Sequence, residues 1–220
     1  MDKYVLITAG GTGKRMGADM PKQFIGLAGK PLLMHCFYPF LRYSPGIPFI
    51  LTLPEAHFDT WRELCRQHHF FHGHELAISG PTRFHSVKNG LRFVPDNALV
   101  AIHDGVRPLV SVETIARGFR HAERYGNAIP CVLPDDSVRL AEHALSSPLP
   151  RHKIRLVQTP QCFISSRIKK AYNKAYSESF TDDASVLETE GDRIFLIEGN
   201  KENIKVTTPP DLRYAESLLL

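Results

Sequence analysis

The chain has 220 residues, which suits one α/β domain and is long enough to bury a substantial core. Apolar residues make up 43% of it and charged residues 23%, a balance that excludes a disordered chain. The net charge of +4 includes no basic run of five or more residues, so it suits acidic small molecules rather than nucleic acid.

Short apolar runs alternate with amphipathic segments along most of the chain. The runs that predict strands are Tyr4–Ile7, Phe49–Leu53, Glu75–Ser79, Ala98–His103, Ala128–Leu133 and Ile194–Glu198. The segments that predict helices are Leu32–Tyr43, Phe58–His68, Arg83–Leu91 and Val112–Tyr125. Ser111 is a suitable N-cap for the last of these helices, and Gly126 is a suitable stop. Strands separated by such helices predict a Rossmann-like, three-layer α/β domain with a mostly parallel sheet.

The alternation breaks at Pro134–Pro150, which has no clear helical pattern. A stretch of this length inside a compact domain predicts a protruding element. Val138–Leu140 and Ile154–Val157 are able to pair as an antiparallel β-arm. Helical patterns resume at Arg167–Ser177 and at Asp182–Glu190, and a last helix is expected after the prolines at 209 and 210. We therefore expect a single domain over residues 1–220 with a protruding β-arm.

The loop after the first strand carries the strongest functional signal. Thr8–Gly17 contains four glycines, which allow backbone N–H groups to approach a ligand closely. Such a concave set of amide donors binds anions. Arg15 and Lys22 add two cations beside it, so the loop is suited to a polyphosphate.

Two well-known phosphate loops do not fit this sequence. A P-loop requires Ser or Thr after Gly-Lys and an opening glycine, whereas Arg15 follows Gly13-Lys14 and Thr8 stands at the opening position. The dinucleotide fingerprint is excluded because Gly17 comes one residue too late, and Pro21 lies where its helix would run.

Thr8–Gly17 together with Pro21–Phe24 resembles the signature of cytidylyltransferases that act on small alditol phosphates, above all the 2-C-methyl-D-erythritol 4-phosphate cytidylyltransferase family. Further blocks of this resemblance follow in family order over nearly the whole chain. They are Gly80–Val87, His103–Pro108, Gln158–Gln161, Thr181–Val186 and Asn203–Thr207.

The resemblance implies an activity, a cofactor and an assembly. It implies transfer of a cytidylyl group from CTP to 2-C-methyl-D-erythritol 4-phosphate, with release of pyrophosphate, in the non-mevalonate isoprenoid pathway. D-ribitol 5-phosphate is the alternative acceptor, although Thr181–Ser185 looks more like the methylerythritol group. Mg²⁺ is expected to be bound mainly through the CTP triphosphate, without a dedicated protein metal site. A homodimer is implied, with a dimerisation arm at about residues 134–157.

The resemblance also implies a role for individual residues. Those implied to bind the nucleotide are Ala9, Gly10, Gly11, Gly13, Gly80, Arg83, Ser86 and Asp104. Those implied to be catalytic are Arg15, Lys22, Arg151 and Lys205, with Lys22 near the α-phosphate and Arg15 toward the leaving pyrophosphate. Those implied to bind the acceptor are Asp104, Arg107, Ser137 and Thr159, with Ser137 and Arg151 reaching the neighbouring subunit's site.

Several of these residues also have a plainer interpretation. Asp104 and Arg107 could form a surface ion pair, and Ser86 could be an ordinary helix-interior serine. Lys205 could be an edge-strand lysine that blocks aggregation. Arg155 lies close enough to Arg151 to leave the choice between them open.

Two further segments are interpreted structurally. Thr181-Asp182 is typical of a helix N-cap. His68–His74, with Cys65 nearby, does not have the spacing of a standard zinc site, and His103 is expected to be a packed strand-end residue. Pro81 cannot donate a backbone N–H, which places in doubt any base contact that depends on that amide.

Two other classes of function remain open at this stage. One is a non-catalytic nucleotide-binding protein, although a mere binder has no need of the cations at Arg15 and Lys22. The other is a nucleic-acid binder, which would need a basic surface lined with aromatic residues.

The sequence also favours a cytoplasmic location. No apolar stretch approaches the length of a membrane span, and the first residues enter a strand without a secretory leader. The four cysteines, Cys36, Cys65, Cys131 and Cys162, form no CxxC pair and are expected to be reduced and buried.

Overall fold

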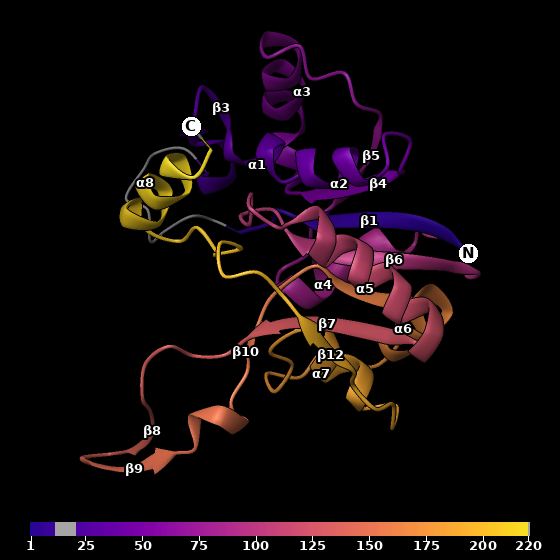
Figure 1. Ribbon diagram of the computed structural model, residues 1–220. Helices are drawn as coiled ribbons and strands as arrows, with labels where there is room; N and C mark the ends of the chain where they lie inside the picture. The colour runs from indigo at the N-terminus through magenta and orange to yellow at the C-terminus, as the bar shows by residue number, and fades with distance from the viewer. Residues whose placement is uncertain (12–20, 220) are drawn as a thin grey trace.

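The computed structural model describes residues 1–11 and 21–219 of the chain. Its centre is an eight-stranded sheet in which six strands run in one direction and β10 and β11 run in the other (Figure 1). The order is β10-β7-β11-β6-β1-β4-β5, and β12 pairs with β7. These strands are β1 (Asp2–Thr8), β4 (Phe49–Leu53), β5 (His74–Ile78), β6 (Ala98–Asp104), β7 (Asn127–Val132), β10 (Leu156–Val157), β11 (Gln161–Ile164) and β12 (Leu196–Glu198).

Helices cover both faces of the sheet and make the expected three layers. One face packs against α1 (Leu32–His35), α2 (Tyr38–Tyr43), α3 (Phe58–Gln67) and α5 (Val112–Tyr125). The other face packs against α4 (Arg83–Leu91), α6 (Ser165–Ala171) and α7 (Asp183–Glu188). Successive side chains of β1 alternate between the two cores, with Val5 and Ile7 on one side and Leu6 on the other. The predicted Rossmann-like α/β class is confirmed.

A smaller cluster lies beside the end of the sheet. The short strands β2 (Gly26–Leu27) and β3 (Lys30–Pro31) pair with each other, and α8 (Pro209–Ser217) packs near them. Thr208 is the N-cap of α8, and a proline opens the helix as the sequence predicted. This cluster brings the segment before α8, which contains Lys205, toward the loop after β6, because the N–H of Val206 donates to the carbonyl of Val106.

The predicted arm is present, but its pairing differs from the expectation. Figure 1 shows β8 (Val138–Glu142) and β9 (Leu145–Leu149) projecting away from the body as a two-stranded ribbon. Val138 pairs with Leu149, so the proposed pairing of residues 138–140 with 154–157 is wrong. Residues 156 and 157 instead form β10, which pairs with β7 in the main sheet.

Three other expectations about the elements are settled. The helix predicted over residues 32–43 is broken into α1 and α2, because Pro39 has no N–H to donate to the carbonyl of His35. Strand β11 was not predicted. Ser111 does cap α5, where its side chain accepts from the N–H of Thr114, and Gly126 ends that helix with a φ of 98°. Within residues 1–11 and 21–219, no helix is both long and apolar enough to cross a membrane.

The connections place a crevice between β1 and β6. After β1 the chain turns toward β4 on one side, whereas after β6 it passes through α5 to β7 on the other side. The direction of winding therefore reverses between these two adjacent parallel strands. Ligands of open α/β sheets bind beyond the carboxyl ends of the strands at such a point. Thr8 and Asp104, which are paired in the register, both lie there.

Candidate active site

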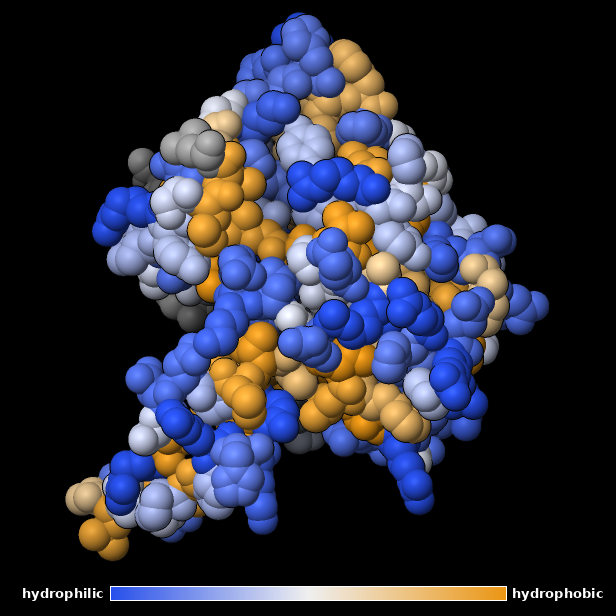
Figure 2. All heavy atoms as spheres, in the orientation of Figure 1, coloured by the Kyte–Doolittle hydropathy of each residue, from blue (hydrophilic) through white to orange (hydrophobic). Residues whose placement is uncertain are grey.

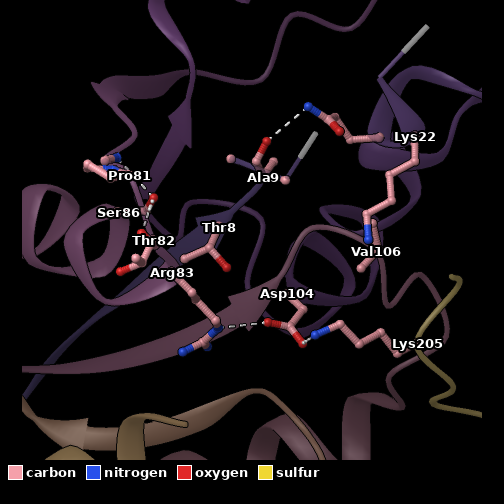
Figure 3. A pocket seen from close by; sticks show the side chains of 14 residues that line it. Thr8, Ala9, Lys22, Pro81, Thr82, Arg83, Ser86, Asp104, Val106 and Lys205 are labelled. Atoms are coloured by element: carbon pink, nitrogen blue, oxygen red, sulfur yellow. Dashed lines mark hydrogen bonds and ion pairs between the residues drawn. The ribbon is translucent and has the colours of Figure 1, made fainter. Parts of the chain in front are cut away.

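A cavity of about 330 Å³ opens beyond the carboxyl ends of β1, β5 and β6 (Figure 3). It brings together nine of the residues that the sequence predicted from four separate segments, namely Ala9, Gly10, Gly11, Lys22, Gly80, Arg83, Ser86, Asp104 and Lys205. Two more predicted residues, Gly13 and Arg15, lie outside the residues that the structure describes. In Figure 3, Lys22 points into the cavity from the side opposite Pro81, Thr82 and Ser86.

The loop after β5 is shaped by its own hydrogen bonds. The Ser86 hydroxyl accepts the N–H of Gly80 at 3.1 Å and donates to the carbonyl of Thr82 at 3.1 Å. A Cβ on Gly80 would lie 2.2 Å from the Cβ of His85, so no other residue fits there without displacement. Ser86 therefore holds the wall of the cavity, and its proton is already engaged. Gly10 is constrained in a similar way, since a Cβ there would lie 2.9 Å from that of Ser79.

Asp104 is the electrostatic centre of the site. Its carboxylate is 8% exposed and lies 3.1 Å from Nε of Arg83 and 3.0 Å from Nζ of Lys205. Nε of Arg107 lies 3.4 Å from the same carboxylate. Burial alone would raise the pKa of Asp104, but the charges of these three cations outweigh burial and hold the pKa well below its usual range. The interpretation of Asp104 and Arg107 as a surface ion pair is therefore wrong.

Arg83 links Asp104 to a second buried carboxylate. Its two Nη atoms each lie 2.7 Å from an oxygen of Asp183, which has no exposed side-chain surface. Burial opposes the charge of Arg83, but Asp183 and Asp104 raise its pKa well above the usual value. The guanidinium thus stays charged while it faces the cavity.

A second cavity of about 260 Å³ lies on the other side of the same three side chains. Arg83, Asp104 and Lys205 line both cavities and form a shared wall between them. Two further residues that the sequence predicted, Arg107 and Thr159, line only the second cavity. Lys205 lies in no strand, so it is not the edge-strand lysine of the plainer interpretation.

Thr159 and His103 fix the backbone of Asp104. The Thr159 hydroxyl accepts the N–H of Asp104 at 3.0 Å and lies 3.0 Å from Nδ1 of His103. Nε2 of His103 lies 2.9 Å from the carbonyl of Arg107, so this nitrogen must carry the hydrogen and Nδ1 must accept from Thr159. Burial lowers the pKa of His103 to about 4. His103 is a packed strand-end residue, as expected.

The match to a family model decides the classification of this chain. The model described as 2-C-methyl-D-erythritol 4-phosphate cytidylyltransferase matches residues 4–220. The chain belongs to the 2-C-methyl-D-erythritol 4-phosphate cytidylyltransferase family. The resemblance drawn from the sequence blocks is confirmed.

Individual members of this cytidylyltransferase family are similar over their full length. The 2-C-methyl-D-erythritol 4-phosphate cytidylyltransferase of Bacteroides thetaiotaomicron is 47% identical over 219 residues, with 100% of both chains covered. That of Porphyromonas gingivalis is 49% identical over 218 residues, with 99% of this chain and 97% of the relative covered. The crystal structure of the Thermus thermophilus enzyme is 31% identical and superposes with a TM-score of 0.81 over 99% of this chain and 98% of that one.

Not all residues that the family resemblance singled out lie at the two cavities. Ser137 and Arg151 are exposed near the arm and line neither cavity, and Arg151 donates to the carbonyl of Asp135 at 2.6 Å. Arg155 is also exposed and donates to the carbonyl of His152 at 2.8 Å. Within a single chain, neither arginine lines either of the two cavities.

The structure also places the histidine tract and the cysteines of this family member. Trp61 donates to Nε2 of His74 at 2.8 Å, and Nδ1 of His74 lies 2.7 Å from the carbonyl of His72. Within residues 1–11 and 21–219, no group of three or more His, Cys, Asp or Glu side chains is placed to hold a metal ion. All four cysteines are free, and all except the half-buried Cys65 are buried.

Two residues that support the cavity walls received no role from the sequence. Gln23 donates to the carbonyl of Ala9 at 3.0 Å and ties the Pro21–Phe24 block to the glycine loop. Asp183 holds Arg83, whereas Asp182 is the N-cap of α7, as the sequence predicted. The signal for Asp183 was available, because a helix cap needs one Asp and the Thr181–Ser185 block contains two.

Proposed function

We propose that this chain catalyses the transfer of a cytidylyl group from CTP to 2-C-methyl-D-erythritol 4-phosphate, yielding 4-diphosphocytidyl-2-C-methyl-D-erythritol and pyrophosphate. Membership of the family supports the reaction, and the two cavities that share a cationic wall are the observation that carries it. A phosphoryl-type transfer between two bound molecules needs adjacent sites and positive charge where they meet.

The first cavity is assigned to CTP. Its glycine loop offers backbone donors from Gly10 and Gly11, and Lys22 points into it. The base and ribose are assigned to the wall made by Gly80, Ser86 and Asp104. Because the Gly80 N–H is engaged by Ser86, base recognition at this wall must use other backbone groups.

The second cavity is assigned to the acceptor. Arg107 and Lys205 supply positive charge for its phosphate, and Thr159 lines the same space. A phosphate oxygen of the acceptor attacks the α-phosphorus of CTP in line, the bond from that phosphorus to the β-phosphate oxygen breaks, and pyrophosphate leaves. Lys22 is assigned to stabilise the charge that develops on the α-phosphate oxygens. No general base is required, since the acceptor phosphate is already an anion.

Mg²⁺ is assigned as the cofactor, held mainly by the triphosphate and water. The donor set fits this assignment, because Asp104 is the only carboxylate among the described residues that line the first cavity, and three cations already engage it. When bound, the ion would offset the negative charge of the triphosphate.

A test compares pyrophosphate release from CTP with two acceptors. We expect release with 2-C-methyl-D-erythritol 4-phosphate and much less with D-ribitol 5-phosphate. Lys22→Ala should abolish turnover while the protein remains folded by circular dichroism. Release with neither acceptor would refute the assigned reaction, and unchanged turnover in Lys22→Ala would refute the role of the lysine.

The arm at about residues 134–157 is assigned to dimerisation of the single domain. In the part of the chain that the structure describes, β8 and β9 pair only with each other, and Leu140 and Leu145 on them are 48% and 79% exposed. Figure 2 shows apolar side chains at the tip of the arm and near its base. Covering this surface with a second copy would bring Ser137 and Arg151 of each chain to its partner's acceptor site.

Complementation between two inactive variants tests this assembly. If each arm reaches the partner's site, a mixed dimer of Lys22→Ala and Arg151→Ala chains has one site that combines an unaltered Lys22 with an unaltered Arg151 from the other chain. We expect co-expressed variants to regain activity that neither has alone. If each arm served its own chain, the mixture would stay inactive.

A further inference from the structure

Asp183 is a buried carboxylate that α7 does not need for its own stability. Asp182 already caps this helix, since its side chain accepts the N–H of Ser185 and the Ser185 hydroxyl accepts the N–H of Asp182. The neighbouring Asp183 has no exposed surface. Burying a charge is costly unless it is paired and hydrogen-bonded, so the partners of Asp183 indicate its purpose.

Those partners are Arg83 and Tyr172. Arg83 places Nη1 and Nη2 at 2.7 Å from the two carboxylate oxygens, which is the paired geometry that fixes a guanidinium plane. The Tyr172 hydroxyl donates to the same carboxylate at 2.6 Å. The Tyr172 ring is stacked on Phe84, with ring centroids 4.7 Å apart. Asp183 is therefore held on one side by a rigid aromatic pair and holds Arg83 on the other.

The orientation of Arg83 matters to both cavities. With its two Nη atoms engaged by Asp183, Arg83 directs Nε to Asp104 at 3.1 Å. Figure 3 shows Arg83, Asp104 and Lys205 in a row along the cavity, with Asp104 between the two cations. Without Asp183, Arg83 would lose two of its three charge-assisted hydrogen bonds and would be free to turn fully onto Asp104 or toward solvent.

We propose that Asp183, supported by Tyr172, is a positioning residue for nucleotide binding, which acts by fixing the guanidinium of Arg83 in the wall of the CTP cavity. The proposal rests on the assignment of that cavity to CTP. It differs from a merely structural role, in which Asp183 would only attach α7 to α4 and its loss would affect folding but not affinity.

The experiment measures the dissociation constant of CTP with Mg²⁺ by calorimetry, well below the unfolding temperature of each variant. Asp183→Asn keeps the size of the side chain but turns an amide N–H toward an N–H of Arg83. Tyr172→Phe removes only the donor and keeps the stacked ring. Glu190→Gln is the matched control, because Glu190 ties Lys170 and Lys174 to the end of α7 rather than holding Arg83.

We expect Asp183→Asn to weaken CTP binding by about 10- to 100-fold, the usual value of hydrogen bonds to charged groups. The KM for CTP should rise with it, whereas kcat at saturating CTP should change less. Tyr172→Phe should weaken binding in the same direction by a smaller factor. Glu190→Gln should lower the unfolding temperature and leave CTP affinity unchanged.

Three results would overturn the proposal. The first is unchanged CTP affinity in a folded Asp183→Asn variant, and the second is an equal loss of CTP affinity in Glu190→Gln. If Asp183→Asn fails to fold, the third is unchanged CTP affinity in Tyr172→Phe. A wild-type protein that binds no CTP would instead refute the proposed function, so the two failures are distinguishable.

Discussion

Replacing His103 with Gln should remove an acid-dependent loss of stability. Burial lowers the pKa of His103 from 6.5 to about 4, although the hydrogen bond to the Arg107 carbonyl opposes the shift. A lowered pKa in the native state means that the stabilisation is complete above the unfolded value of 6.5 and is lost as the pH falls through the native value. The difference between the two pKa values corresponds to about 3 kcal/mol of unfolding free energy.

The assay is urea unfolding of wild type and His103→Gln at several pH values between about 7.5 and 4. Gln keeps an N–H for the Arg107 carbonyl and does not titrate. The unfolding free energy of wild type, relative to that of His103→Gln, should therefore fall by about 3 kcal/mol on acidification. Titrations elsewhere in the chain cancel in this comparison. A difference that stays constant with pH would refute the reasoning, because it would mean that His103 is protonated equally in the folded and unfolded states.

Three other predictions follow from the site and the fold. Lys205→Ala should lower kcat/KM for pyrophosphate release by about 10²- to 10³-fold. The control Lys169→Ala, which removes a lysine on α6 that pairs with Asp96, should not change it. Removal of metal with EDTA should stop pyrophosphate release and added Mg²⁺ should restore it; turnover without any divalent ion would contradict the assigned cofactor. Ser111→Ala should cost about 1 kcal/mol in urea unfolding through the lost cap of α5 and leave kcat unaltered, and a stability equal to wild type would show that the cap bond contributes nothing.

The sequence predicted all six of the strands that run in one direction in the main sheet. Strand β4 has the predicted bounds, because Phe49–Leu53 is a continuous apolar run that is buried on both faces. Helix α5 also has the predicted bounds, since Ser111 and Gly126 mark its two ends by local chemistry. Where apolar periodicity and capping residues agree, local sequence is sufficient to place an element.

Features that depend on tertiary pairing were missed. Strand β11, with only four residues, is defined by its position between β6 and β7 rather than by any pattern of its own. The predicted pairing of residues 138–140 with 154–157 is wrong because β9, with which β8 pairs, contains Pro148 and two serines and does not resemble a strand. In the site, motif blocks located the cavity, but only the folded structure reveals that Arg83 bridges Asp104 and Asp183.

The isolated pairing of the arm has a consequence for amide hydrogen exchange. A two-stranded ribbon is marginally stable by itself in water, so the amides of β8 and β9 should exchange within seconds in a monomer. The strands of the main sheet should retain their protons far longer, because β1 and β6 are paired on both edges. Protection of the arm that rises with protein concentration would therefore report a second chain on it, and fast exchange at every concentration would show that the ribbon stands alone.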